Sequence, residues 1–541
     1  MVDIRVSKPA EPELKVGRAA EGKLDGDQSV DYMLDLELQE VALVLLESAG
    51  FRGRLCILDP GGRAIRICGL NQDGEVSAAF VADVKGCYRV RLMAAPGLEG
   101  GCYKLVLKQK LKLEERVRQV EKPRLEGSRI ARLRAQLTAN AGQTELFWAE
   151  IERLGTPLLE PDPDDAGLTL CTFIWKGAEL VRNVRVHLLF RTTLPNEYEM
   201  TRVEGSDVWY TTIQLPSKGR FAYRLLVNTP SGPPPVADST EADKLIYFAS
   251  AQADPLNPRR CFETGVSRYE EMSLLEMPDA PLQPWTDKRP GVRCGIVEQF
   301  SFHSRVLQND RFVSVYTPPD YSEQAGPYGL LVVFDEQWFL ARIPVPVILD
   351  NLLDGRKIPP LVAVFVGNGP GNARSRELPC NPLWAEFIED ELIVWVRNHY
   401  HVTSNPDQAI VAGASYGGLA ASYIALKHSR IFGNVLSQSG SYWWQPPDKA
   451  GQLQQNFMVS LVLQQPRLPL RFYLDAGTGE IGLAGNACSI LDANRHLRDV
   501  LLAKGYEVNY QEFVGGHDFL SWRGTFADGL IWLSKCMGES P

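Results

Sequence analysis

The sequence predicts a chain of mixed class, in which two all-β sandwiches precede a larger α/β domain. Short apolar or alternating runs separated by turn residues fill two stretches, from about 28 to 110 and from about 168 to 275. From about 291 onward, short apolar runs alternate with helical stretches, which indicates a mostly parallel sheet with helices on both faces. We therefore expect segments at 1–110, 111–165, 166–285 and 286–541.

The first predicted sandwich contains two similar strands. GCYRVRLM and GCYKLVLK flank a turn that is rich in glycine and proline. After them, residues 111–165 carry charged residues and helix formers at helical spacing, with interruptions near Pro123 and Gly127. This pattern predicts two helices that link the sandwiches. No residue in 1–160 points to catalysis, so we expect that stretch to be dispensable for chemistry.

The second predicted sandwich, at 166–285, has strand patterns in LTLCTFIWKG, RVHLLF, DVWYTTIQL and RFAYRLLVN. Polar turns separate these strands. The connector at 276–290 is rich in proline, and a stiff connector predicts a fixed placement of the sandwich on the domain that follows.

The composition is that of an ordinary globular protein, with 45% hydrophobic and 23% charged residues. The formal net charge is −9 and no basic run is present, which argues against a nucleic-acid partner, because such binding requires phosphate neutralisation. No apolar stretch reaches the ~18 residues needed to span a bilayer. The polar start, MVDIRVSKPAEPELKVG, lacks the apolar core of a secretory signal, so we expect no membrane partner and a cytoplasmic location.

Ten cysteines are scattered along the chain without a CxxC pair. That spacing does not indicate a zinc knuckle or a redox motif, and the density is not that of a disulfide scaffold. We therefore expect reduced, buried thiols, no metal site and no cofactor.

One segment, AIVAGASYGGLAASYIALKH, predicts a strand, a tight turn and a helix in succession. At the turn, the pattern G-x-S-x-G runs from Gly413 to Gly417 and places Ser415 at its centre. Side chains at the glycine positions would collide with the neighbouring strand and helix. This pattern is the nucleophile elbow of α/β-hydrolases, and its context favours a catalytic serine over a structural turn. We therefore expect Ser415 to be a nucleophile in a C-terminal domain with the α/β-hydrolase fold.

A nucleophilic serine needs a base, and the chain has seven histidines. His517 lies in EFVGGHDFLSW, after a predicted strand and near the C-terminus, where the chain order serine, acid, histidine of this fold requires it.

The acid must fall between Ser415 and His517, where RFYLDAGTGE offers Asp475 and Glu480. We prefer Glu480, because Asp475 is expected inside the strand end. Asp518 is expected to cap a turn.

Two backbone amides are expected to stabilise the oxyanion that forms when a serine attacks a carbonyl. One is the amide of Tyr416, which begins the helix after Ser415. The second donor in this fold comes from the loop after the third strand. That loop is VVFDEQWFL, and we predict a donor at Gln337 or Trp338. The alternative for Trp338 is a place in the core.

Several long motifs carry a specific resemblance. GASYGGLAASYIALKHSRIFGNVLSQSGSYWW, RELPCN, VGGHDFLSWRG and FDEQWF resemble the enterochelin (enterobactin) esterase family, which cleaves catecholate siderophores. VEGSDVWYTTIQL, ADPLNP and LEMPDAPLQPW match that family's N-terminal β-sandwich and connector. The resemblance covers about residues 168–541. At the acid, the family usually reads Glu-Ala-Gly-x-x-Glu-Pro, whereas this chain runs from Asp475 through Ala-Gly-Thr-Gly to Glu480 and Ile481.

The resemblance implies a serine esterase that hydrolyses ferric enterobactin-like trilactones and so releases iron inside the cell. Such a substrate is a bulky trianion, so cationic and aromatic residues in the matching motifs are expected to bind it. They are Arg376, Trp443, Trp444, Trp522 and Arg523, with Trp384 as a further candidate. At least half of these tryptophans are expected to be structural. The iron is expected to arrive with the substrate and not as a cofactor.

The two sandwiches also admit a different function. The alternative is a carbohydrate or feruloyl esterase with glycan-associated sandwiches, or a domain without activity. That alternative predicts secretion and rows of exposed aromatic residues, and the polar N-terminus argues against it.

The first sandwich resembles, on strand pattern alone, the pre-peptidase modules appended to hydrolases. We expect the second sandwich to lie over the carboxyl ends of the parallel strands and to act on substrate binding more than on catalysis.

Overall fold

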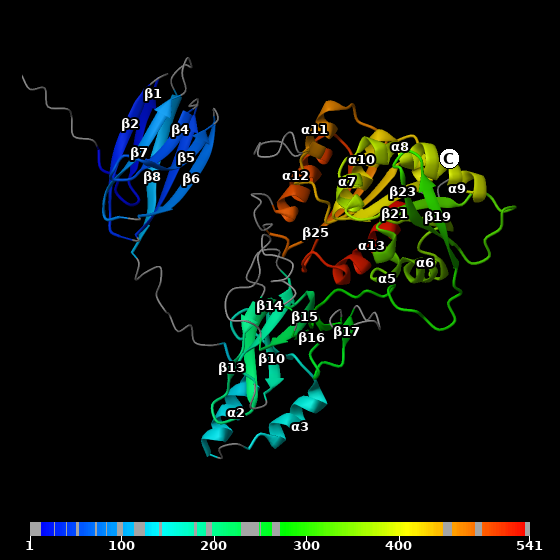
Figure 1. Ribbon diagram of the computed structural model, residues 1–541, viewed down its shortest axis with the longest axis horizontal. Coiled ribbons are helices and arrows are strands. Elements are labelled where there is room, and N and C mark those ends of the chain that lie inside the picture. Colours follow the sequence, from blue (N-terminus) through cyan, green and yellow to red (C-terminus); the bar gives the residue numbers. More distant parts are fainter. Residues whose placement is uncertain are drawn as a thin grey trace, which may run out of the picture. The chain divides into compact units, whose positions relative to one another are not determined.

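The structure is a computed structural model, and Figure 1 labels many of its helices and strands. The chain falls into two compact units, Met1–Arg124 and Leu125–Pro541. The described residues are 12–25, 28–38, 40–49, 53–70, 73–82, 84–94, 101–112, 125–139, 143–177, 181–190, 197–228, 248, 250–261, 271–446, 457–481 and 489–535.

The first unit is an antiparallel β-sandwich. One sheet has the strand order β1-β8-β3-β6 and the other has the order β2-β7-β4-β5. Alternate residues along the strands point inward, so that Leu34, Val44, Leu55 and Leu105 are buried between the sheets. This confirms the first predicted all-β region. The strands are β1 (Ala19–Leu24), β2 (Ser29–Leu36), β3 (Val41–Ala49), β4 (Gly53–Leu58), β5 (Ala64–Leu70), β6 (Asp73–Val81), β7 (Gly86–Ala94) and β8 (Gly101–Leu111).

The second unit begins with another antiparallel region. Its sheets have the orders β13-β14-β10-β9 and β12-β11-β15-β18-β17, with β16 paired to β15. Phe173, Val186, Leu215 and Leu225 belong to the core between them. The strands are β10 (Leu168–Lys176), β11 (Val184–Leu189), β12 (Glu197–Glu199), β13 (Thr201–Arg202), β14 (Val208–Pro216), β15 (Arg220–Val227), β16 (Ala251–Gln252), β17 (Arg260–Cys261) and β18 (Met272–Glu276).

Part of the predicted linker at 111–165 belongs to this second sandwich. Its elements are α2 (Ser128–Ala139), α3 (Glu145–Leu154) and β9 (Leu158–Pro161). Apolar residues at helical spacing on α2 and α3 pack on Ile174 and Tyr210 of the sandwich, and β9 pairs with β10. These elements are therefore not a free linker, because their apolar faces are buried. The predicted break near Pro123 lies outside the described residues.

The rest of the second unit is built on one sheet with the order β19-β20-β22-β21-β23-β24-β25-β26. β19 and β20 form an antiparallel edge, and the other six strands run parallel. β21, β22 and β23 are apolar along almost their whole length, as expected for strands covered on both faces. The strands are β19 (Ile296–Ser304), β20 (Asn309–Thr317), β21 (Gly329–Phe334), β22 (Leu361–Val366), β23 (Ala409–Ala414), β24 (Asn434–Gln438), β25 (Arg471–Gly477) and β26 (Glu507–Phe513).

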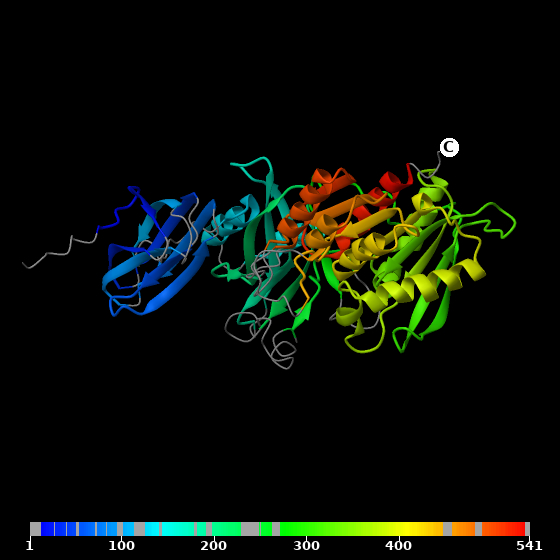
Figure 2. The same cartoon turned by 90° about the horizontal axis from the view of Figure 1, so that it is seen from above.

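Helices cover both faces of this sheet, as Figures 1 and 2 show from two directions. α5, α6 and α13 pack on one face through Leu349 and Leu530, and α8 to α12 pack on the other through Leu419 and Leu497. This arrangement confirms the predicted α/β part. The helices are α5 (Glu336–Ala341), α6 (Val345–Asp354), α7 (Ala373–Glu377), α8 (Pro382–Glu386), η1 (Phe387–Ile393), α9 (Val394–His399), η2 (Pro406–Gln408), α10 (Tyr416–Lys427), α11 (Phe457–Gln464), α12 (Ile490–Ala503) and α13 (Phe519–Ser534).

The connector holds the second sandwich to α13. Nε2 of Gln283 donates a hydrogen bond to the carbonyl of Leu520 (2.7 Å), and Nε of Arg523 donates to Oε1 of Gln283 (2.7 Å). Leu520 also packs on Ala222 and Met272 of the sandwich. The sandwich is therefore joined to the helix that begins just after His517.

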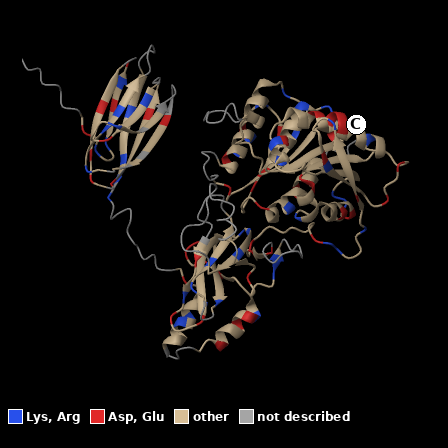
Figure 3. Ribbon diagram, viewed as in Figure 1, with Lys and Arg blue, Asp and Glu red and all other residues tan. Residues whose placement is uncertain are grey.

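Basic and acidic residues are interspersed along the drawn elements (Figure 3). None of the described helices is long and apolar enough to cross a membrane. The described cysteines form no disulfides with one another; Cys102 and Cys294 are exposed, although buried thiols were expected. Cys488 and Cys536 lie outside the described residues.

We expect a chain that begins at Leu125 to keep its fold and its activity on a small soluble ester, because the unit boundary precedes α2. A chain that begins at residue 165 lacks α2, α3 and β9 and leaves Ile174 and Tyr210 uncovered. Loss of that apolar burial should lower its Tm and its solubility. Thermal unfolding and kcat of the two truncated chains test this. Equal stability of the two chains would contradict the assignment of the helices to the sandwich.

Candidate active site

The turn at Ser415 has the geometry expected of a nucleophile elbow. β23 ends at Ala414 and α10 begins at Tyr416, so Ser415 alone forms the turn. Its φ and ψ are 58° and −121°, a sparsely populated region for a residue with a side chain. A Cβ on Gly413 would lie 2.5 Å from the carbonyl carbon of Gly417. Glycine is therefore required where the strand approaches the helix.

Gly417 also admits the loop that follows β21. A Cβ at this position would lie 3.1 Å from Oδ2 of Asp335. Asp335 is fully buried, has a left-handed φ of 65° and precedes α5. Its carboxylate accepts hydrogen bonds from Nδ2 of Asn368 (2.8 Å) and from Nε and Nη2 of Arg374 (2.7 and 2.9 Å). These bonds fix the loop beside the elbow.

The structure brings His517 and Glu480 together. Nδ1 of His517 forms a short hydrogen bond with Oε1 of Glu480. Glu480 is fully buried, and its Oε2 accepts a hydrogen bond from the N–H of Gly477 (2.6 Å). The ring of Trp522 packs edge-on against the His517 ring, with centroids 4.7 Å apart and planes at 86°. Because the carboxylate holds Nδ1, Nε2 is the ring nitrogen left to accept a proton from a hydroxyl.

Ser415 and His517 are not hydrogen-bonded to each other, although both are described. Oγ of Ser415 lies 3.2 Å from Oγ of Ser441. The backbone N–H of Ser415 donates a hydrogen bond to the carbonyl of Gln438 (2.9 Å). A catalytic hydrogen bond of this kind often tightens only in the substrate complex, so the arrangement remains compatible with catalysis. The contact with Ser441 had no signal in the sequence, because the two serines lie 26 residues apart.

The other two acids near the histidine have different partners. Asp475 lies in β25, is fully buried and accepts a backbone hydrogen bond at 3.1 Å. Asp518 caps α13, because its Oδ1 accepts from the N–H groups of Leu520 (2.8 Å) and Ser521 (3.2 Å). Burial raises the pKa of each of these carboxyls to about 7. Neither of these described carboxyls hydrogen-bonds to the histidine.

Two backbone N–H groups beside the elbow are open to an acceptor. Tyr416 is the first residue of α10, and Gln337 lies in the first turn of α5. Neither backbone N–H has a hydrogen-bond acceptor among the described residues. By contrast, the N–H of Trp338 donates to the carbonyl of Asp335 (2.9 Å). Of the two positions expected in this loop, Gln337 is therefore the one with an available amide.

Arg374 belongs to this site, although no motif in the sequence singles it out. Besides its pairing with Asp335, its guanidinium stacks on the rings of Trp338 (4.6 Å) and Tyr416 (5.6 Å). Arg376, the expected residue, is exposed on the same short helix, α7. The two arginines are two positions apart in RSRELPCN, and such positions on a helix do not face the same way. The motif therefore indicates the helix but not which arginine faces the elbow.

Two of the expected tryptophans border the elbow. Trp443 packs on Tyr416 with ring centroids 6.1 Å apart, and Trp444 packs edge-to-face on Phe457 at 5.7 Å. Both tryptophans are half-buried. They closely follow Ser441, so aromatic surface lies beside the candidate nucleophile.

The other three residues that were expected to bind the substrate contact other parts of the protein. Trp522 is buried, and its Nε1 donates to Oγ of Ser439 (2.9 Å). Arg523 is bonded to Gln283 of the connector. Trp384 is fully buried in the core of the α/β part. These side chains support the site, the connector and the core. Motif matching located the segments but could not show which way each side chain faces.

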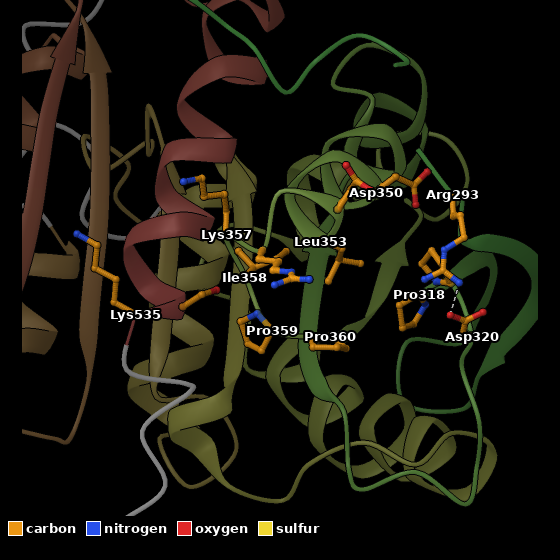
Figure 4. A pocket seen from close by; sticks show the side chains of 14 residues that line it. Arg293, Pro318, Asp320, Asp350, Leu353, Lys357, Ile358, Pro359, Pro360 and Lys535 are labelled. Carbon is orange, nitrogen blue, oxygen red and sulfur yellow. Dashed lines mark hydrogen bonds and ion pairs between the residues drawn. The ribbon is translucent and has the colours of Figure 1, made fainter. Parts of the chain in front are cut away.

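A cavity of about 450 Å³ adjoins the elbow, because Gln337 and Arg374 are among the residues that line it. It opens at the carboxyl edge of the parallel strands. A cavity of about 660 Å³ lies at the opposite edge, where Pro360 precedes β22 and Lys535 follows α13 (Figure 4). That second cavity contains none of the expected site residues.

Comparisons with known proteins agree with this architecture. The family model described as putative esterase matches residues 304–533, and the model described as enterochelin esterase, N-terminal, matches residues 170–286. The iron(III) enterobactin esterase of Dickeya dadantii (strain 3937) is 30% identical over 428 residues, which are 73% of this chain and 94% of that protein. The chain belongs to the enterochelin esterase family. It is therefore a carboxylic ester hydrolase.

Other enterochelin esterase relatives cover a similar share of the chain. The iron(III) salmochelin esterase of Escherichia coli O6:H1 is 29% identical and covers 74% of this chain and 97% of that protein. A crystal structure of the enterobactin esterase of Shigella flexneri in the presence of enterobactin matches with a TM-score of 0.58 at 28% identity, over 73% of this chain and 98% of that one. The first unit lies outside the residues that the two family models match.

We expect Glu480→Gln to lower kcat by about 10³ to 10⁴-fold, because the amide no longer holds the imidazole in its reactive tautomer. Asp475→Asn should change kcat by only a few fold, since that carboxyl does not contact His517. Steady-state kinetics on a small soluble ester compare the two variants, which are matched in chemistry and in burial. If Asp475→Asn were the more harmful change, Glu480 would not be the acid.

Proposed function

We propose that this esterase hydrolyses the ester bonds of catecholate trilactone siderophores of the ferric enterobactin type and so releases their iron. One observation carries the proposal. The chain spans 94% of a relative named as an iron(III) enterobactin esterase. It also has the strained turn at Ser415 and the hydrogen-bonded pair of Glu480 and His517. The iron is part of the substrate.

In the acylation step, Oγ of Ser415 attacks the carbonyl carbon of one lactone ester while Nε2 of His517 takes the hydroxyl proton. Glu480 keeps the imidazole oriented through Nδ1 and stabilises the imidazolium that forms. The tetrahedral intermediate collapses when the ester C–O bond breaks. The leaving alkoxide takes the proton back from His517, which leaves the acyl group on the serine.

The oxyanion of the tetrahedral intermediate is stabilised by the N–H groups of Tyr416 and Gln337. Each lies in the first turn of a helix, where backbone donors have no intrahelical acceptor. Water then attacks the acyl-enzyme and gives its proton to His517, and the same two donors stabilise the second intermediate. The product is a linear catechoyl-serine ester, and Ser415 recovers its proton.

Cationic and aromatic side chains beside the elbow suit a bulky catecholate anion. Arg374 stacks between Trp338 and Tyr416, and Arg376 is exposed on the same helix. Guanidinium groups pair with catecholate oxygens and stack on aromatic rings. Trp443 offers a half-buried ring next to Tyr416. These contacts would bind the substrate without taking part in proton transfer.

We expect Ser415→Ala to keep the fold and to lower kcat on the order of 10⁶-fold, because the turn depends on its glycines and not on the hydroxyl. Ferric and iron-free trilactone siderophores, together with feruloyl sugars, are the substrates to compare. Linear catechoyl-serine products are sought by mass spectrometry. Ser301→Ala, at an exposed serine of edge strand β19, is the control.

Two results would contradict this function. Retained hydrolysis by Ser415→Ala would exclude the serine as the nucleophile. Hydrolysis of feruloyl sugars in preference to either trilactone by the unaltered protein would favour the glycan-associated esterase instead.

A further inference from the structure

One residue of the second sandwich contacts both the acid loop and the histidine loop. Phe190 directly follows β11, and its main-chain carbonyl lies against Gly479 and Gly516. These glycines immediately precede Glu480 and His517 in the chain. A Cβ on either glycine would overlap the Phe190 carbonyl oxygen. Neither glycine has a left-handed φ, so the approach of Phe190, and not the backbone conformation, requires glycine at these positions.

The two loops form one layer against Phe190. The N–H of Gly479 donates to the carbonyl of Gly515 (2.9 Å), and the N–H of Thr478 donates to the carbonyl of Phe513 (2.9 Å). A Cβ on Gly477 would lie 2.6 Å from the same Gly515 carbonyl oxygen. The loops are therefore in contact along their length, and a shift of one displaces the other.

Phe190 is fixed from the sandwich side by its ring. The ring packs edge-to-face on Phe221 with centroids 4.8 Å apart, and the residue is 9% exposed. The preceding residue, Leu189, pairs with Ala222, which packs on Leu520 at the start of α13. The carbonyl is thus held between the sandwich core and the loops that carry the acid and the histidine.

From these contacts we propose that Phe190 is a positioning residue for the Glu480–His517 pair, so that the second sandwich acts on the chemical step. The inference rests on the function proposed above for Ser415, His517 and Glu480. The sequence predicts that this sandwich acts on substrate binding more than on catalysis, and the proposal adds a role in the chemical step. A displacement of about 1 Å at a catalytic group costs on the order of 10²-fold in rate, so a fixed contact here has a large effect.

The first test uses Gly479→Ala and Gly516→Ala, each of which forces Phe190 away from one loop. The control is Gly326→Ala, at a glycine with nothing within 4 Å of an added Cβ and no left-handed φ. With p-nitrophenyl butyrate as the substrate, we expect kcat to fall roughly 10-fold or more in the two test variants, with KM little changed. The control should keep the kcat of the unaltered protein.

The second test keeps both loops unchanged and alters the anchor. Phe190→Leu removes the ring that fixes the carbonyl, and Phe173→Leu removes another buried ring of the same sandwich core, one that packs on Tyr223. Both changes should lower Tm. Only Phe190→Leu should lower kcat, and it should also weaken or shift the low-field proton resonance of the His517 Nδ1–H group, a signal that loss of stability alone does not change.

The outcomes separate this inference from the proposed function. Unchanged kcat in the folded glycine variants and in Phe190→Leu would overturn the positioning role, and so would an equal loss of kcat in Phe173→Leu. If the glycine variants do not fold, the phenylalanine pair decides. A failure of the unaltered protein to cleave trilactones, with p-nitrophenyl butyrate still hydrolysed through Ser415, would contradict only the proposed substrate.

Discussion

The candidate active site depends on one steric constraint, the close approach of β23 to α10 around Ser415. No Cβ fits on Gly413, because it would lie 2.5 Å from the carbonyl carbon of Gly417. The absence of a side chain at Gly417 also admits the buried Asp335, whose loop carries the open amide of Gln337. The same two glycines thus permit the strained conformation of the serine and the approach of the loop that carries the proposed second amide donor.

Burial is the second constraint on the site. Glu480 is fully buried, and both of its oxygens are occupied, one by the ring of His517 and one by a backbone N–H. A buried carboxylate without such partners would be strongly unfavourable. Burial raises the pKa of the neighbouring Asp475 and Asp518 to about 7. Phe190 contacts the loops of Glu480 and His517 from the sandwich side.

The fold class, the turn at Ser415 and the meeting of Glu480 with His517 could be predicted, because periodicity, glycine spacing and chain order are properties of the sequence. The role of Arg374 could not, because the direction of a side chain on a short helix depends on how the helix packs. Phe190 gave no signal, since the loops that it contacts at Gly479 and Gly516 lie far from it in the sequence. The packing of α2 and α3 was likewise missed, because an amphipathic pattern does not identify its partner surface.

The central claim is that Ser415 is the activated nucleophile of this esterase. Its most direct test is mass spectrometry of the intact protein, and then of its peptides, after reaction with a fluorophosphonate, which phosphonylates activated serines. The account predicts one adduct per chain, on the peptide that contains Ser415, and slow labelling when His517 is replaced by alanine. Inactivation with an adduct on a different residue, or full activity after complete labelling of Ser415, would contradict it.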